Sequence, residues 1–248
     1  PAQSATASRR EFIGHHGSVQ SPEAVLACNS LSGLVEAGHD PCSAMARDVT
    51  LAPGETIDLI WMLGDAGSEE EAVALAKEHG ARDFDERLSD NERHWSDFLG
   101  TLQVHTPDAA FNAIVNAWLP YQAIACRIRA RSAFYQASGA FGFRDQHQDT
   151  MAFMLHDPSL AREQILNAAR RQFPEGDVQH WWLPTSGAGV RTMISDDVVW
   201  LGYAVAHYVS VTGDKAILDE QLPFITGDAL AEGQHDAFYT PTVTSDTV

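Results

Sequence analysis

The sequence predicts a mostly helical chain that begins with the last part of a β-rich domain and continues into an α/α toroid or barrel. Three observations support this prediction. Apolar residues alternate up to about Leu63, they recur at helical spacing from Ser68, and from about Thr106 long helices are joined by loops rich in polar and aromatic residues. We expect those loops to build a site at one end of the helices.

The first region has the pattern of strands. The stretches AVLACNSLSG and ARDVTLAPGETIDLIWMLGDA combine alternating apolar residues with turn-forming residues. In the second stretch, Pro53 and Gly54 separate two apolar runs, which is typical of a β-hairpin. We therefore expect a hairpin centred on these two residues.

Two helices are expected to connect this region to the rest of the chain. Ser68 is placed to cap the first helix, and three glutamates follow in the first turn, where the helix dipole favours negative charge. The second helix is predicted over FDERLSDNERHWSDFLGTL, because its large apolar residues recur at helical spacing.

The third region predicts one helix after another. Pro107 and Asp108 open a helix whose apolar residues lie nearly all round it, so we expect burial on more than one side. A turn is predicted at Asp157 and Pro158, and Gly213 is the expected stop of a later helix. Successive helices joined by unusual loops favour the toroid.

The composition limits the partners. Asp and Glu total 34 against 16 Lys and Arg, a formal net charge of -18, which excludes a basic face for nucleic acid. We interpret the excess of acidic residues as an adaptation for solubility, for example in high salt. A specific cationic partner is the alternative interpretation. Without an apolar run of about 18 residues or a leader, a soluble, cytoplasmic chain is expected. The chain begins at Pro1 and ends in TPTVTSDTV, so we expect a piece of a longer protein.

The three cysteines, Cys28, Cys42 and Cys126, are unevenly spaced and include no CxxC pair. Neither a disulfide framework nor a zinc site follows from such spacing. Buried free thiols are the expectation.

The motif FGFRDQHQDTM concentrates hydrogen-bonding groups behind two phenylalanines, and we expect it to precede a helix that starts near Asp149 or Thr150. Arg144 and Asp149, with neutral amides between them, suit a neutral polyol, because a carboxylate accepts from paired hydroxyls and a guanidinium donates to oxygens. An internal ion pair of Arg144 with Asp145 or Asp149, with Asp149 capping its helix, explains the motif equally well.

A second loop is predicted over FPEGDVQHWWLPTSGAGVRTMISDDVVW. Adjacent tryptophans beside a histidine and acids are typical of carbohydrate sites, because an indole face covers the apolar face of a pyranose. The tryptophans are also candidates for the core, and the DD pair is a candidate helix cap. No partner stands at metal-ligand spacing from the histidine, so no metal is expected. The polar and aromatic residues concerned are Asp177, Gln179, His180, Trp181, Trp182, Arg191, Asp196 and Asp197.

The runs YQASGAFGFRDQHQD and ARRQFPEGDVQHWWLPTSGAGVRTMISDDVVWLGYAVAHYVSVTGDKAILDE resemble the inverting glycoside phosphorylases of glycoside hydrolase family 94, the cellobiose and chitobiose phosphorylase group. The similarity is strongest to the phosphorylase-like region of cyclic β-1,2-glucan synthases and to 1,2-β-oligoglucan phosphorylases. It covers most of the chain, including GHDPCSAMARDVTLAPGET and GQHDAFYTPTV, and it is specific because several motifs occur in order.

The resemblance implies a domain organisation. In the family a β-sandwich is followed by a helical linker and an (α/α)6 barrel. Residues 1–66 would be the C-terminal part of the sandwich, 67–104 the linker, and 105–248 the N-terminal, truncated part of the barrel.

The resemblance also implies a reaction. Inorganic phosphate would attack the anomeric carbon of a β-glucoside, preferably β-1,2-linked, while a carboxylic acid protonates the leaving oxygen and α-glucose 1-phosphate forms. The family's acid lies in a DWND-type motif that does not occur in these 248 residues. We therefore expect no catalytic residue here and no turnover by this chain alone, with Asp196 and Asp197 assigned to site shaping or helix capping.

The expected ligands are a gluco-oligosaccharide and phosphate, with no cofactor or metal, and a homodimer is one expected state. Two alternatives stay open: a phosphate-independent hydrolase on the same toroid, and a non-catalytic glucan-binding or chain-length-control module of a membrane-bound, inner-membrane-associated synthase. The expected substrate-binding residues are Arg144, Asp145, Gln148, Asp149, His180, Trp181, Arg191, Asp196 and Asp197.

Overall fold

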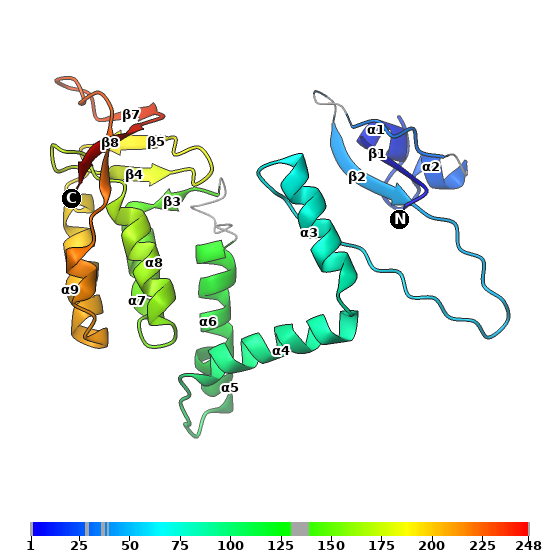
Figure 1. Ribbon diagram of the computed structural model, residues 1–248, viewed down its shortest axis with the longest axis horizontal. Helices are drawn as coiled ribbons and strands as arrows, with labels where there is room; N and C mark the ends of the chain where they lie inside the picture. Colours follow the sequence, from blue (N-terminus) through cyan, green and yellow to red (C-terminus); the bar gives the residue numbers. More distant parts are fainter. Residues whose placement is uncertain (1, 28–29, 36–37, 39, 130–138, 248) are drawn as a thin grey trace. The chain divides into compact units, whose positions relative to one another are not determined.

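The computed structural model describes residues 2–27, 30–35, 38, 40–129 and 139–247 (Figure 1). The chain divides into two compact units, Pro1–Lys77 and Glu78–Val248. Cys28, expected to be a buried thiol, and the first residues of the YQASGAFGF run lie outside the described residues. Each unit is described by itself below.

The first unit contains a two-stranded antiparallel sheet and two short helices. β1 (Ser4–Ser8) pairs with β2 (Pro41–Ala46), while α1 (Arg9–Ile13) and α2 (Glu23–Leu26) lie between them in sequence. A small apolar core joins these elements. Its members are Ala24, Leu31 and Ala44, with Phe12 and Cys42 packed against them.

The hairpin predicted around Pro53 and Gly54 forms only its turn. Gly54 has a φ of 85°, and the N–H of Glu55 donates to the carbonyl of Ala52 at 3.0 Å, as in a type II turn. The flanking residues 47–66 form no strand, and the large apolar side chains between Ile57 and Leu63 are exposed. The predicted pair of strands is therefore wrong for this chain. The physical reason is that an isolated hairpin needs further strands or a helix to cover its apolar face.

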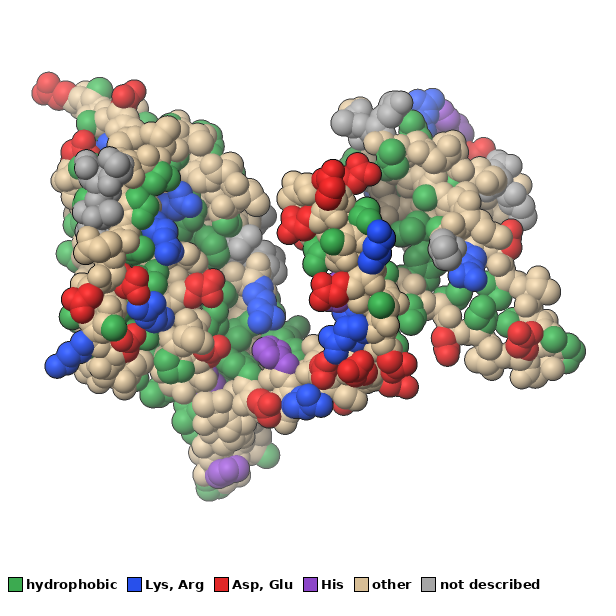
Figure 2. Space-filling view, viewed as in Figure 1, with side chains coloured by type: hydrophobic (Ala, Val, Ile, Leu, Met, Phe, Trp, Pro, Cys, Tyr) green, Lys and Arg blue, Asp and Glu red, His purple; other side chains and the backbone are tan. Residues whose placement is uncertain are grey.

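The two connector helices form as predicted. α3 (Glu69–Ala81) begins at Ser68, whose Oγ accepts a hydrogen bond from the N–H of Glu71 at 3.2 Å. α4 (Phe84–Gly100) begins at Asp83, whose carboxylate accepts two N–H bonds from its first turn. Acidic side chains gather over these two helices (Figure 2).

Residues 109–129 form one continuous helical stretch in which α-helical and π-helical turns alternate. Pro120 lies inside this stretch and cannot donate a backbone hydrogen bond, so one bond of the regular α-helical ladder is missing there. Asp108 caps its start, as predicted. The successive segments are α5 (Ala109–Ala113), η1 (Ile114–Trp118), α6 (Leu119–Gln122) and η2 (Ala123–Arg129).

The predicted burial of this stretch on more than one side is wrong for this chain. Ile124 and Ile128 pack with Phe98 of α4 and with Phe153. The other face is open, since Trp118 is 57% exposed. Among the described residues, packing partners contact one face of the stretch, and several of its other large apolar residues are exposed.

Three helices and a 3-10 turn carry the main core of the second unit. The core contains Met154, Ala161, Ile165, Ala204, Tyr208 and Ile217. The elements are α7 (Phe143–Phe153), α8 (Pro158–Ala169), α9 (Asp197–Thr212) and η4 (Ala216–Asp219).

The start of α8 and the end of α9 lie where the sequence predicted a turn and a helix stop, whereas the start of α7 differs from the prediction. Asp157 caps α8 by accepting two N–H bonds, and Gly213, with a φ of 75°, ends α9 in the left-handed conformation. α7, however, begins at Phe143 rather than near Asp149 or Thr150. The FGFRDQHQDTM motif is therefore mostly helical, because residues spaced three and four apart from Phe143 onward share one buried face.

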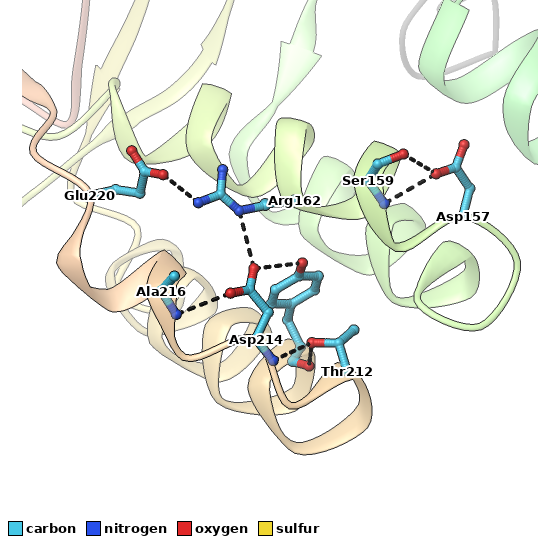
Figure 3. Close-up of polar contacts among 8 residues, drawn as sticks. Asp157, Ser159, Arg162, Thr212, Asp214, Ala216 and Glu220 are labelled. Carbon is cyan, nitrogen blue, oxygen red and sulfur yellow. Dashed lines mark hydrogen bonds and ion pairs between the residues drawn. The ribbon is translucent and has the colours of Figure 1, made fainter.

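A network of charges ties α8 to the segment after α9 (Figure 3). Arg162 Nε lies 3.1 Å from Asp214 Oδ2, and the same guanidinium bonds to Glu220. The hydroxyl of Tyr208 donates to Asp214 at 3.1 Å. The network holds the turn that follows Gly213 against α8.

A four-stranded antiparallel sheet lies at one end of α7, α8 and α9 (Figure 1). The sequence predicted a loop where its two central strands form. A Cβ at Gly189 would lie 2.1 Å from the carbonyl oxygen of Trp181, so glycine permits their close approach. The sheet contains, in order, β3 (Phe141–Gly142), β4 (Gln179–Trp182), β5 (Gly189–Thr192) and β7 (Asp236–Tyr239), and a separate pair contains β6 (Pro223–Thr226) and β8 (Thr242–Thr247).

Two further predictions from composition concern the thiols and the membrane. Cys42 and Cys126 are free thiols, but both are half-buried rather than buried. Among the described residues, the helices are too short or too polar to cross a membrane.

Candidate functional site

Polar side chains from three elements meet where the first turns of α7 and α9 pack beside β4. Arg144 and Asp145 belong to α7, His180 to β4, and Asp196 and Asp197 to the start of α9. We call these five residues the polar cluster. The chain thus brings together five of the nine residues that the sequence predicted for the site.

His180 and Asp197 form the tightest contact of the polar cluster. His180 Nδ1 lies 2.7 Å from Asp197 Oδ2, and the Asp197 side chain is 2% exposed. The hydrogen bond to Asp197 raises the pKa of His180 against the effect of burial, with Asp145 adding to the rise and Arg144 opposing it. The contact with Asp197 therefore stabilises the charged form of the imidazole.

Arg144 and Asp196 form the outer part of the polar cluster. Arg144 Nη1 lies 3.1 Å from Asp196 Oδ2, and both side chains are exposed. The indole Nε1 of Trp200 donates to the same oxygen at 3.4 Å. Asp196 stands at the N-cap position of α9 but makes no side-chain capping bond. Instead of capping the helix, Asp196 contacts Arg144 and Asp197 contacts His180.

Asp149 lies further along α7 and bonds to a residue that the sequence did not single out. Its Oδ2 accepts from Arg127 Nε at 2.7 Å, and both side chains are about 15% exposed. Burial raises the pKa of Asp149 to about 6, although Arg127 acts to lower it. The alternative in which Arg144 pairs with Asp145 or Asp149 is not what forms, because Arg144 reaches Asp196 instead.

The motif on α7 has a buried face that takes no part in the polar cluster. His147 is fully buried, its ring meets that of Phe143 edge to face at 4.8 Å, and burial lowers its pKa to about 4. Gln146 donates to the carbonyl of Arg127 at 3.3 Å. Three of the seven polar residues in the motif, Gln146, His147 and Thr150, therefore belong to the core.

Arg191 is 2% exposed and bonded on every side. Its Nε and Nη2 each lie 2.6 Å from an oxygen of Asp177, and Nη2 also reaches Glu175. Nη1 donates to the carbonyls of Gly227 and Asp228, and the guanidinium stacks over Phe173 at 3.9 Å. These contacts join β5 to two other segments and leave no N–H of Arg191 for a ligand in this arrangement.

Trp181 and Gln148 lie outside the polar cluster. Trp181 is half-buried on β4, and its ring lies 5.8 Å from that of Phe238 on β7. Gln148 is exposed on α7. Trp182, by contrast, is buried against Phe141, as expected of a core tryptophan.

Arg127 was missed by sequence reasoning, and so was Phe238. Arg127 stands in the run RIRARS, where nothing distinguishes it from the exposed Arg129 two residues later. Its role follows only from the packing of η2 against α7. Within the described ranges, histidines, cysteines and carboxylates form no cluster that could hold a metal ion.

Comparisons with known proteins match most of the chain. Residues 94–240 match the model of the glycosyl hydrolase 94 superfamily catalytic domain, and residues 1–82 match that of the glycosyl hydrolase 94 supersandwich domain.

Three relatives show the range of similarity. The chain is 58% identical over 238 residues to cyclic beta-(1,2)-glucan synthase NdvB of Rhizobium meliloti, covering 96% of the chain and 8% of that protein. It is 31% identical over 232 residues to solabiose phosphorylase of Paenibacillus borealis, covering 92% and 28%. It is 25% identical over 262 residues to N,N'-diacetylchitobiose phosphorylase of Vibrio furnissii, covering 94% and 32%. The chain therefore spans less than a third of each relative.

Proposed function

Because this chain belongs to the glycosyl hydrolase 94 superfamily, we propose that it supplies sugar-binding residues to an enzyme that cleaves β-glucosides with inorganic phosphate. The observation that carries the proposal is the polar cluster, in which an arginine, a histidine and three carboxylates from α7, β4 and the start of α9 meet. Carboxylates accept from adjacent hydroxyls and a guanidinium donates to oxygens, so the arrangement suits a polyol.

The chemistry that we propose is phosphorolysis with inversion. A phosphate oxygen forms a bond to the anomeric carbon while the glycosidic bond breaks, and a carboxylic acid gives its proton to the leaving oxygen. The products are α-glucose 1-phosphate and a glucan shortened by one unit, with β-1,2-linked gluco-oligosaccharides as the preferred substrate.

We place the proton donor outside these 248 residues. Asp196 and Asp197 are bonded to Arg144 and His180. Asp149 has a raised pKa, but Arg127 bonds to it and favours its ionised, accepting form. The chain by itself would then bind a sugar without turnover.

The wider setting is part of the same proposal. The helices α5 to α9 would be the first helices of an (α/α)6 barrel, with the polar cluster at its mouth and the remaining helices supplied by further sequence. The enzyme would be a cytoplasmic protein that uses phosphate as co-substrate without a cofactor, and a homodimer is the proposed assembly.

A second candidate function is favoured by one observation. The relative with 58% identity is a glucan synthase of which this chain spans 8%. The chain could then belong to a module that holds or trims a growing glucan and sets its length. In that case the polar cluster would bind glucan while the complete protein releases no sugar phosphate.

The test measures α-glucose 1-phosphate released from β-1,2- and β-1,4-gluco-oligosaccharides, with and without phosphate, by this chain and by the complete protein that contains it. We expect phosphate-dependent release by the complete protein and none by the chain. Arg144→Ala in the complete protein should lower the rate about 100-fold or more, whereas the matched control Arg129→Ala should leave it unchanged.

Two outcomes contradict the proposal. Sugar release without phosphate would make the protein a hydrolase. Glucan binding without any product would favour the chain-length-control module.

A further inference from the structure

The sequence places Asp196 and Asp197 side by side, yet the fold gives them different environments. The Asp196 carboxylate is 45% exposed and meets Arg144, whereas the Asp197 carboxylate is 2% exposed and meets His180. A ligand at the surface of the polar cluster can reach the first carboxylate but not the second. Asp197 can therefore act on a ligand only through His180.

The contact between them fixes the histidine ring. Nδ1 faces Asp197 Oδ2 at 2.7 Å and donates its proton to the carboxylate, which leaves Nε2 on the opposite side of the ring. The His180 side chain is 30% exposed, and Nε2 makes no hydrogen bond with the part of the chain that the structure describes. The ring thus presents one nitrogen outward in a defined orientation.

The charges around the ring select the kind of ligand. Asp145, Asp196 and Asp197 carry three negative charges, while Arg144 and a protonated His180 carry two positive ones. An anion would meet net negative charge, which costs energy in a partly buried site. An uncharged hydroxyl oxygen meets no such penalty and can accept the proton on Nε2.

We propose that Asp197 is a positioning residue, which holds His180 so that Nε2 donates a hydrogen bond to a hydroxyl oxygen of the sugar bound at the polar cluster. This inference rests on the proposed function, since it takes the ligand to be a glucose unit. It narrows that function, because it assigns the sugar rather than phosphate to His180 and removes Asp197 from the residues that touch the substrate.

The arrangement makes sugar binding depend on pH. The charged groups that face His180 are Asp197 from α9 and Asp145 and Arg144 from α7. Asp197 and Asp145 raise the pKa of His180, and Arg144 opposes that rise. As the pH rises through that pKa, Nε2 loses the proton it donates and the affinity for sugar falls. Asp149 also titrates, with a pKa of about 6. The pH dependence of sugar affinity must therefore be compared with the pH dependence measured in His180→Gln, which lacks the imidazole.

The experiment titrates the full 248-residue chain with sophorose, the β-1,2-linked glucose disaccharide, and follows the histidine ring nitrogens by NMR. In Asp197→Asn we expect the pKa of His180 to fall, so that at a given pH fewer rings carry the proton on Nε2, and the affinity for sophorose to drop about ten-fold. Asp85→Asn removes the same charge from the first turn of another helix, α4, and should change none of these.

His180→Gln provides a second test in which the buried Asp197 side chain is not substituted. Sophorose affinity should lose its decline with rising pH in this variant, while any contribution from Asp149 remains. This arm stands even where Asp197→Asn fails to fold.

Several results would overturn the inference: the same affinity and His180 pKa in Asp197→Asn as in Asp85→Asn, an unchanged pH dependence in His180→Gln, or no sophorose binding by the unmodified chain. Failure of the proposed function is a separate result, since it would appear as a complete protein that binds sophorose but releases no phosphate-dependent product.

Discussion

Replacing Arg127 by methionine removes the cation that faces a buried carboxylate. Asp149 is 14% exposed, and its pKa is about 6 with Arg127 at 2.7 Å, against an ordinary value of 3.8. The folded state therefore holds this proton more tightly than the unfolded state. Stability contributed by Asp149 falls as the pH rises from about 4 to about 6, and a shift of about two units corresponds to about 3 kcal/mol.

Without Arg127, the pKa of Asp149 should rise further, because burial remains and the neighbouring positive charge is gone. Each additional unit costs about 1.4 kcal/mol of folding free energy at a pH where Asp149 is ionised in the unfolded state. Breaking a buried ion pair from one side costs about 3–5 kcal/mol in all. At about pH 5 the loss should be smaller, since the folded state can then keep Asp149 protonated.

The assay is urea unfolding of Arg127→Met at about pH 5 and about pH 8, followed by tryptophan fluorescence. Arg129→Met is the matched control, because Arg129 belongs to the same helical segment and is exposed; it should lose less than about 0.5 kcal/mol. An added Asp149→Asn change should restore much of the stability at the higher pH. An equal loss at both pH values would refute this reasoning, since it would assign the effect to packing rather than to the charge on Asp149.

Other substitutions test separate parts of the fold and site. Gly189→Ala should lower the free energy of unfolding by about 1–3 kcal/mol or more, because the new Cβ meets backbone of β4, whereas Gly202→Ala has open space in α9 and should raise it by about 0.5–1 kcal/mol in the same urea assay. Arg162→Gln should lower the thermal midpoint, and the difference should shrink in about 1 M NaCl because the contacts with Asp214 are partly exposed. Trp181→Ala should raise the KM for oligosaccharide in the complete protein more than it changes stability; lost stability with an unchanged KM would assign the ring to the core.

The sequence predicted best the helix starts and stops, which depend on residues close together in the chain. Ser68 and Asp108 cap helices where helix starts were predicted, and Asp157 caps α8 at the predicted turn, because these side chains need only reach N–H groups two or three positions away. Gly213 ends α9 because only its own backbone conformation is involved. The family, too, was predicted from ordered motifs, and the matches to both domain models confirm it.

Sequence reasoning failed where a prediction needed a packing partner. Residues 47–66 have the alternation of a hairpin, but their apolar face is not covered and only the turn at Gly54 forms. The loop expected before α9 is instead a pair of strands, since Gly189 lets β5 approach β4. The start of α7 was misplaced because its buried face, which includes His147, was interpreted as part of a polar loop.

The sequence by itself determined which residue types the candidate site could use, and five of the nine predicted residues meet in the polar cluster. The tertiary structure alone decided their partners. Arg144 finds Asp196 across 52 positions of sequence, and Asp149 finds Arg127 rather than Arg144. Periodicity and capping act over a few residues, whereas the choice of an ion-pair partner depends on which helix faces are buried together, and that is fixed only when the helices pack.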